Sequence, residues 1–243
     1  MISVRELRKS FDGQPVLKAV DLDITDGETM VILGPSGQGK TVLIKSMVRL
    51  LEPDSGSVAF DGQEILGLKK KPLREFLKCS AFVFQNSALF DFLSVDENLR
   101  LYMRMHTASS VKAMDDEIID ALSTVGLDRA VLGKFPEELS GGMKKRVAIA
   151  RAIVKKPRYL FYDEPTTGLD KGNAEKISEL ITALKARFGV TSIIVTHDIA
   201  LMHEVSDRVA LLKDGRIFFV GRREDISAQT LTSLYEAGEL NGL

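Results

Sequence analysis

The fold of this chain follows from one stretch of its sequence, Gly34-Pro35-Ser36-Gly37-Gln38-Gly39-Lys40-Thr41. This is a P-loop, in which glycines let backbone N–H groups turn inward around phosphates while the lysine reaches the β and γ oxygens. The apolar run 30–33 before it predicts a strand. Apolar positions at helical spacing from Val42 to Leu50 predict a helix that begins near Gly39 and is stopped by Pro53 and Gly56. Strand, glycine-rich loop and helix are the context that this motif requires.

Short strand-like runs lie on both sides of this unit. Residues 2–33 alternate such runs with turns, of which Asp12-Gly13 is one, and Val58-Ala59-Phe60 before Asp61-Gly62 predicts one arm of a hairpin. Residues 79–85 predict a return to the sheet. The single cysteine, Cys79, is expected as a buried thiol on that strand. One cysteine can form neither an internal disulfide nor a cysteine-rich zinc site.

The sequence pattern becomes helical between residues 86 and 156. We predict that this segment is a helical lobe inserted into an α/β core made of residues 1–85 and 157–229, with a short tail at 230–243. The core resumes with a strand, a helix and a second strand, which is the arrangement of a mostly parallel sheet. Within these segments we expect helices at 95–105, 111–125, 140–154 and 177–184, strands at 159–162 and 192–196, and a hairpin at 208–221.

The charge balance is close to neutral, with 33 Lys and Arg against 34 Asp and Glu and a net charge of −1 in 243 residues. No bulk attraction to DNA, RNA or anionic lipid is evident, so nucleic acid is not expected as a partner. The first eleven residues carry charges with no apolar segment behind them, which is not the pattern of a secretory signal. The longest uncharged stretches fall well short of the ~20 apolar residues that cross a bilayer. We therefore expect a cytoplasmic chain.

Three further motifs follow the P-loop: Leu139-Ser140-Gly141-Gly142-Met143, Tyr159-Leu160-Phe161-Tyr162-Asp163-Glu164 and His197. In this order the motifs resemble those of the nucleotide-binding subunit of an ABC (ATP-binding cassette) ATPase, and the resemblance covers nearly the whole chain. It implies a single ABC ATPase domain over residues 1–243. The implied fold is α/β, a P-loop NTPase (RecA-like) core with a mostly parallel sheet, an N-terminal antiparallel β subdomain and an inserted α-helical subdomain.

The resemblance implies that the P-loop binds ATP together with Mg²⁺. Lys40 is the implied catalytic cation on the phosphates, and the Thr41 hydroxyl reaches Mg²⁺. Asp163 ends an apolar strand, where its carboxylate is expected to hold the Mg²⁺ shell, and Gln85 is the third implied metal ligand. The expected ATP ligands in the loop are Gly34, Pro35, Ser36, Gly37, Gln38, Gly39, Lys40 and Thr41.

Three catalytic residues beyond Lys40 are implied. Glu164 is expected to polarise the attacking water, His197 to contact the γ-phosphate and orient that water, and Gln85 to meet both water and Mg²⁺ through its amide. The loop after Gln85 contacts a permease in the family. Taken one at a time, these residues have plainer interpretations, because two acids after a strand are common in turns and a lone histidine at a strand end is more often structural.

Further ATP contacts are implied across a subunit boundary. Ser140, Gly141 and Gly142 start a predicted helix and form an anion site of the same physical kind as the P-loop. In the family this motif meets the ATP of the other subunit, which implies a head-to-tail homodimer enclosing two nucleotides. Asp170 fits the D-loop at that interface, although a turn before a helix would look the same. Phe11 matches the aromatic residue that stacks on adenine, whereas a phenylalanine beside a turn is otherwise usually core.

Two departures from the common pattern inform the subfamily. Met143 stands where many ABC ATPases have glutamine, and Lys171 follows the D-loop where proline is frequent. Met143 and the stretch 84–90 make the chain look like the ATPases of Mla/Mce-type phospholipid transport systems. That resemblance implies integral membrane permease subunits as partners, with an MCE-domain lipid-binding protein and a small cytosolic regulator as further candidates. It places the chain peripherally on the cytoplasmic face of the inner membrane.

The leading hypothesis is a transport ATPase whose closure around ATP pushes on a separate permease for phospholipid or other hydrophobic cargo. Phe90, Phe92 and Leu93 look too apolar for an ordinary exposed loop and suggest the docking surface, although packing inside the lobe would explain them equally well. An ABC ATPase of another transport system and a cytosolic assembly ATPase of the iron–sulfur scaffold type stay open as alternatives. The single cassette disfavours a ribosome-associated ATPase, and Glu164 with His197 disfavours a regulator without turnover.

Overall fold

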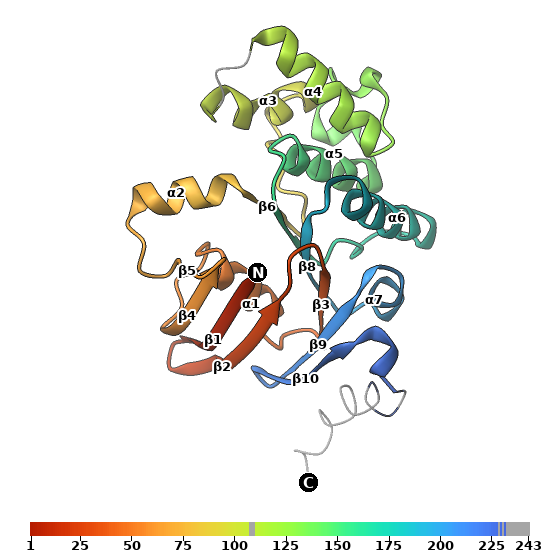
Figure 1. The fold of residues 1–243 in the computed structure, drawn as a ribbon. Coiled ribbons are helices and arrows are strands. Elements are labelled where there is room, and N and C mark those ends of the chain that lie inside the picture. The colour runs from red at the N-terminus through yellow and green to blue at the C-terminus, as the bar shows by residue number, and fades with distance from the viewer. Residues whose placement is uncertain (107–109, 228, 230, 232–243) are drawn as a thin grey trace.

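The computed structural model describes residues 1–106, 110–227, 229 and 231. Its central sheet has six strands in the order β10-β9-β3-β8-β7-β6 (Figure 1). All neighbours in this sheet are parallel except β9 and β10, which form the predicted terminal hairpin. The strands are β3 (Thr29–Leu33), β6 (Ser80–Val83), β7 (Tyr159–Asp163), β8 (Thr191–Thr196), β9 (Arg208–Lys213) and β10 (Arg216–Arg222).

A second sheet is formed by the N-terminal part of the chain. It is antiparallel, with the order β2-β1-β4-β5. Its strands are β1 (Ile2–Phe11), β2 (Gln14–Ile24), β4 (Ser55–Phe60) and β5 (Gln63–Glu64). The predicted turn at Asp12-Gly13 joins β1 to β2, and Gly13 there has a φ of 77°, which glycine adopts without strain.

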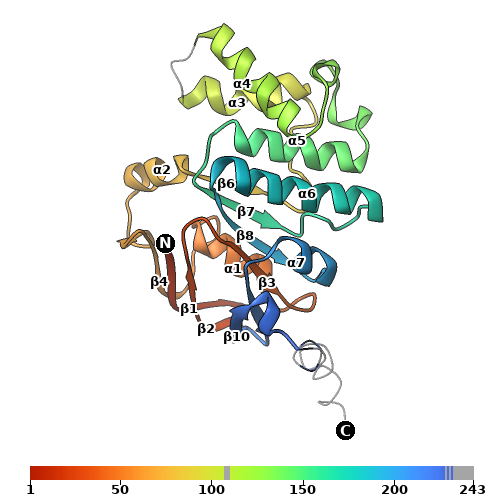
Figure 2. The same ribbon diagram turned by 45° about the vertical axis from the view of Figure 1, so that its right-hand side comes forward.

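The central strands are buried on both faces, which explains their nearly continuous apolar sequences. Along β7, Leu160 and Tyr162 face the core on the helical side, while Tyr159 and Phe161 face the core shared with the antiparallel sheet. Figure 2 shows α5 and α6 over the first face of the sheet. Helix α1 packs on the other face, between the two sheets.

Seven helices are described in these residues. Helices α3, α4 and α5 gather at one end of the molecule, away from the antiparallel sheet (Figure 1). The mixed architecture confirms the predicted fold class, whereas the boundaries of the helical lobe at 86 and 156 stay a prediction. The helices are α1 (Lys40–Met47), α2 (Lys70–Lys78), α3 (Val95–His106), α4 (Val111–Thr124), α5 (Gly141–Ile153), α6 (Lys171–Phe188) and α7 (Ile199–Val205), with short 3-10 turns at Arg129–Val131, Pro136–Glu138 and Arg223–Asp225.

The predicted end of the P-loop helix was wrong. Helix α1 ends at Met47 and Leu50 is 52% exposed, so Leu50 does not belong to the apolar face. The chain leaves the helix at Arg49, whose φ of 53° lies in the left-handed region. The left-handed backbone at Arg49 therefore ends the helical turn, and the chain has left the helix before Pro53.

Two predictions around Cys79 also differ from the structure. Strand β6 covers only residues 80–83, and Cys79 instead closes α2, half-buried, with its thiol donating to the Phe76 carbonyl. Helix α2 itself is absent from the sequence predictions. Its apolar residues recur at helical spacing, but the helix buries none of its side chains fully.

Two further helical predictions concern the start of α4 and the C-terminal tail. Val111 begins α4 but is 71% exposed, so the buried stripe of that helix does not begin there. In the predicted tail, Leu231 is partly buried and its N–H donates to the Ser227 carbonyl. The predicted helix face at Leu234 and Tyr235 lies outside the described residues.

Candidate active site

The P-loop occupies the turn between β3 and α1. Gly37 and Gly39 have φ values of 80° and 93°, so both need the left-handed freedom of glycine, and Gly39 is the residue that caps α1. Gly34 is required for a different reason. A Cβ there would lie 2.3 Å from the Leu212 carbonyl oxygen of β9. The loop is thereby shaped around the N-terminus of α1, where backbone N–H groups attract anions.

Lys40 and Thr41 are held from both sides of this loop. The Lys40 ammonium, 5% exposed as a side chain, donates to the carbonyl oxygens of Gly34 and Pro35 at 2.8 and 2.9 Å. The Thr41 hydroxyl donates to Asp163 Oδ1 at 2.7 Å. The side chain of Gln38 turns elsewhere and accepts from the Asp214 N–H, in the turn between β9 and β10.

A cleft of about 430 Å³ opens in front of the loop. It brings together residues that are far apart in the sequence and come from the ends of parallel strands, the usual place for a ligand site in such sheets. Hydrogen-bond donors and one cation dominate the end of the cleft beside the P-loop, so this end suits a polyphosphate anion. The lining residues are Ser36, Gly37, Gly39, Lys40, Thr41, Val42, Gln85, Glu164, Thr167 and His197.

Glu164 is the buried carboxylate of this cleft, with only 7% of the residue exposed. Its Oε2 accepts from the hydroxyls of Thr167 and Thr196, both at 3.2 Å, and lies 2.9 Å from His197 Nδ1. Its Oε1 lies 3.4 Å from the Lys40 ammonium. The Glu164 backbone has a φ of 48°, a strained conformation that is typical of functional sites. The arrangement fixes one carboxylate at the wall of the cleft.

Asp163 and its neighbours suit a small divalent cation. Thr41, Asp163 and Gln85 offer hydroxyl, carboxylate and amide oxygens, the hard donors that Mg²⁺ prefers, and the Thr41–Asp163 hydrogen bond keeps two of them together. Among the described residues, no group of three or more His, Cys, Asp or Glu side chains could hold a metal ion. The set therefore fits Mg²⁺ that is shared with substrate phosphates rather than enclosed by protein ligands alone.

Burial raises the pKa of the Asp163 carboxyl, while the Thr41 hydrogen bond and the nearby Lys45 and Lys40 act in the opposite direction. A carboxyl whose pKa is raised by folding opposes folding wherever it is ionised, and this penalty disappears as the pH falls below its unfolded pKa. We expect Asp163→Asn to raise the melting temperature of the nucleotide-free protein at pH 7, because the amide carries no charge to desolvate and its oxygen can still accept from Thr41.

Thermal melts of Asp163→Asn and the unsubstituted protein between pH 7 and pH 4 measure this difference. The gain should shrink as the pH falls, since protonation then relieves the original carboxyl. A variant that melts lower at pH 7 would show that hydrogen bonding outweighs the desolvation of this carboxyl.

The predicted ATP contacts at Ser140–Gly142, Asp170 and Phe11 do not line this cleft. Ser140 caps α5 and accepts from the Met143 N–H at 3.3 Å, while Asp170 caps α6 and accepts from Asn173. Phe11 ends β1 with 43% of its surface exposed, so the core interpretation of this residue was wrong. Within one chain, the predicted ATP ligands therefore lie in separate places.

Three residues of this region were missed as site residues. Thr167 and Thr196 hold the Glu164 carboxylate, and each stands within three residues of a predicted site residue, which is the only signal that the sequence offers for them. Lys145 reaches behind the cleft to the backbone of Gln85 and Glu164. Nothing in the basic run 144–146 distinguishes a buried lysine from an exposed one.

Comparison with known proteins agrees with this geometry. A model of the ABC transporter family matches residues 17–167. The probable ribonucleotide transport ATP-binding protein mkl of Mycobacterium leprae is 38% identical over 223 residues, which cover 92% of this chain and 64% of that protein. The lipoprotein-releasing system ATP-binding protein LolD of Bacteroides thetaiotaomicron is 41% identical over 219 residues, 89% of this chain and 99% of that protein. This chain spans less than two thirds of the length of its mkl relatives.

Solved structures show the same similarity in three dimensions. A dimeric bacterial ABC transporter cassette superposes with a TM-score of 0.85 at 31% identity, covering 91% of this chain and 98% of that one. A dimeric ATP-binding cassette in a post-hydrolysis state bound to ADP and Pi gives a TM-score of 0.84, also at 31% identity, with the same two coverages. With the P-loop cleft and the family match together, this chain belongs to the ABC transporter family, as an ATP-binding cassette.

Proposed function

We propose that this protein hydrolyses ATP and thereby drives a separate membrane permease. The observation that carries the proposal is the convergence of Lys40, Glu164 and His197 on one cleft in front of the P-loop. In this proposal the P-loop N–H groups and Lys40 bind the β- and γ-phosphates. Lys40 then exchanges its carbonyl partners for phosphate oxygens, which are stronger acceptors because they are charged.

Glu164 acts as the general base in this proposal. Its carboxylate is oriented by Thr167 and Thr196 and can accept the proton of an attacking water. His197, 2.9 Å from that carboxylate and half-exposed toward the cleft, contacts the γ-phosphate and keeps the water in place. Gln85 adds an amide to the lining of the same cleft. Thr41, Asp163 and Gln85 would hold Mg²⁺, which when bound neutralises charge that develops on the phosphates.

A head-to-tail homodimer would complete the site. Ser140, Gly141, Gly142 and Asp170 stand outside the P-loop cleft of their own chain. A second copy can present these helix N-termini to the same ATP, and the solved cassettes that superpose over 91% of this chain are dimers. Phe11, exposed at the end of β1, would stack on the adenine.

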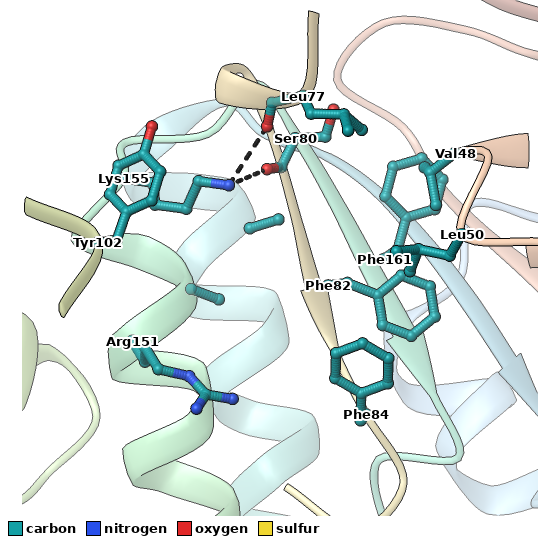
Figure 3. A pocket seen from close by; sticks show the side chains of 12 residues that line it. Val48, Leu50, Leu77, Ser80, Phe82, Phe84, Tyr102, Arg151, Lys155 and Phe161 are labelled. Carbon is teal, nitrogen blue, oxygen red and sulfur yellow. Dashed lines mark hydrogen bonds between the residues drawn. The ribbon is translucent and has the colours of Figure 1, made fainter. Parts of the chain in front are cut away.

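The permease would dock on an apolar groove between α2, β6 and the helices α3 and α5. This groove holds about 320 Å³, and Figure 3 shows Phe82, Phe84 and Phe161 along one wall with Arg151 and Lys155 opposite. Its other lining residues include Leu50, Leu77 and Tyr102. The exposed rings of Phe90 and Phe92, with centroids 5.8 Å apart, add an apolar surface in the loop that precedes α3. An apolar helix end of a permease is the occupant that such a surface fits.

Three observations concern membrane, cargo and partners. No helix within residues 1–106 and 110–227 is long and apolar enough to cross a bilayer. The similarity to LolD, which is named for lipoprotein release, supports a lipid-bearing or other hydrophobic cargo. The MCE-domain protein is proposed as a further partner from the resemblance at Met143 and residues 84–90 alone. Relatives named for spermidine/putrescine and phosphonate import show how widely cargo varies among such cassettes. Nothing supports extending the proposal to a small regulator.

Affinity purification from native membranes in mild detergent tests this function, with Mg-ATP hydrolysis assayed in the eluted fraction. An integral membrane chain that co-elutes supports the transport proposal. A soluble assembly partner without any membrane chain would favour the cytosolic assembly ATPase instead.

Phe92→Asp tests the docking surface. Because Phe92 is 77% exposed, this change should leave the fold and the ATPase activity of the isolated chain intact. We expect it to lower the co-purified permease by about 5- to 30-fold, the loss typical of one apolar contact residue. Phe218→Asp is the matched control, since Phe218 is 48% exposed on β10 in the other part of the molecule. Equal permease recovery in both variants would remove Phe92 from the interface.

A further inference from the structure

Lys145 is a buried cation that the proposed mechanism does not use. It lies on α5, five residues after Ser140, and is only 4% exposed. Its ammonium donates to the backbone carbonyl of Gln85 and, at 3.3 Å, to the backbone carbonyl of Glu164. One side chain of α5 thus contacts both residues that are proposed to face the attacking water.

The burial of the Lys145 charge is offset in part by its surroundings. Burial lowers the pKa of the ammonium, and the nearby carboxylates of Asp163 and Glu164 act in the opposite direction. A buried charge persists only where partners offset its desolvation. Two carbonyl acceptors and two neighbouring carboxylates offset part of that desolvation, and the two carbonyls give the N–H donors of Lys145 their partners.

Lys145 contacts the backbone of Gln85 and Glu164 and not their side chains. The side chains of Gln85 and Glu164 both line the cleft, whereas Lys145 is not part of its lining. The Glu164 backbone, with its φ of 48°, needs its surroundings to hold it in that conformation. Lys145 thus contacts both backbones without lining the cleft.

The loop after Gln85 is held by the same helix. Ser87 and Ala88 have φ values of 61° and 47°, two successive non-glycine residues in the left-handed region. Arg151 of α5 donates to their carbonyl oxygens at 3.0 and 2.7 Å. Helix α5 therefore fixes the backbone of residues 85–88 at two points, at Gln85 through Lys145 and at the strained turn through Arg151.

We propose that Lys145 is a positioning residue. Through its two backbone contacts it sets the separation of Gln85 and Glu164, and this separation changes when α5 moves. The inference rests on the proposed ATPase function. Since Ser140 begins α5, any movement of this helix when the proposed dimer closes is passed to the backbone of both residues. Lys145 itself makes no hydrogen bond to the P-loop.

Lys145→Met tests the inference, because methionine keeps most of the side-chain length without charge or donors. We expect kcat for ATP hydrolysis to fall about 10- to 100-fold, the usual loss when catalytic groups shift by about 1 Å, while KM for ATP stays within about threefold. Lys145→Gln keeps an amide donor and should give an intermediate kcat. Lys145→Gln also provides the test if Lys145→Met does not fold.

Arg49→Met is the matched control. Arg49 also donates to two backbone carbonyls, those of Ile65 and Leu68 at 3.1 and 2.7 Å, but it lies outside the cleft. Its loss should lower the melting temperature without lowering kcat. If both variants lost kcat equally, or if Lys145→Met kept the original kcat while folded, Lys145 would not be a positioning residue.

Hydrogen–deuterium exchange gives a readout that needs no turnover. In folded Lys145→Met we expect faster amide exchange in residues 85–88 and 164–167, with the P-loop unchanged. Unchanged exchange in both segments would overturn the inference. A parent protein without ATPase activity would contradict the proposed function, while the exchange experiment would still decide the role of Lys145.

Discussion

Glu164→Gln should lower kcat for ATP hydrolysis by about 10²–10⁴-fold, the usual contribution of a general base. The amide is nearly isosteric with the carboxylate, and its oxygen can still accept from Thr167 and Thr196, so the local structure should persist. It cannot accept the proton of water. Nucleotide affinity should be retained, since the P-loop and Lys40 are untouched. Steady-state ATPase kinetics together with equilibrium binding of ATP measure both quantities.

The same variant should reveal the dimer. Because ATP would bind without being hydrolysed, Glu164→Gln with Mg-ATP should sediment at twice the mass of the nucleotide-free chain. Glu179→Gln is the control, since Glu179 is exposed on α6 and should leave kcat unchanged. Normal turnover in Glu164→Gln would remove Glu164 from the role of general base.

Lys40→Met should weaken ATP binding by about 10- to 150-fold, because a charge-assisted hydrogen bond contributes about 1.5–3 kcal/mol. The change also removes the cation that lies 3.4 Å from Glu164, so hydrolysis should fall further than binding. Isothermal titration with ATP and with ADP separates the effects, since the loss should be larger for ATP if Lys40 contacts the γ-phosphate.

Lys78→Met controls for the loss of a lysine, since Lys78 pairs with the exposed Glu75 on α2, away from the cleft. It should bind ATP like the parent chain. Equal affinity for ATP in Lys40→Met and Lys78→Met would mean that the Lys40 ammonium stays on the carbonyls of Gly34 and Pro35 when nucleotide binds.

Local rules account for the elements that were predicted well. The P-loop helix begins where Gly39 was expected to start it, because a left-handed glycine and a run of helix-forming residues act within a few positions. The hairpin at Asp214-Gly215 and the strand before Glu164 follow in the same way from turn chemistry and short apolar runs. Each of these signals is contained in the segment that it shapes.

The errors occurred where burial decides the outcome. Leu50 and Val111 continue helical patterns but are exposed, because no other element covers them. Cys79 lies in an uncharged run that suggested a strand, yet its N–H donates to the Phe76 carbonyl and keeps it at the end of α2, so β6 begins one residue later at Ser80. The apolar residues of helix α2 recur at helical spacing, but the helix has only nine residues, so the pattern is too short to separate a helix from a loop.

By itself the sequence determined the P-loop, the order of the motifs and the α/β class, since these depend on residue types and spacing along the chain. Only the tertiary structure decided which of those residues meet. It joined Lys40, Glu164 and His197 in one cleft and left Ser140 and Asp170 outside it. It also placed Lys145 behind both Gln85 and Glu164. The physical reason is that parallel strands distant in sequence end at one sheet edge, so contacts there depend on strand order and not on spacing.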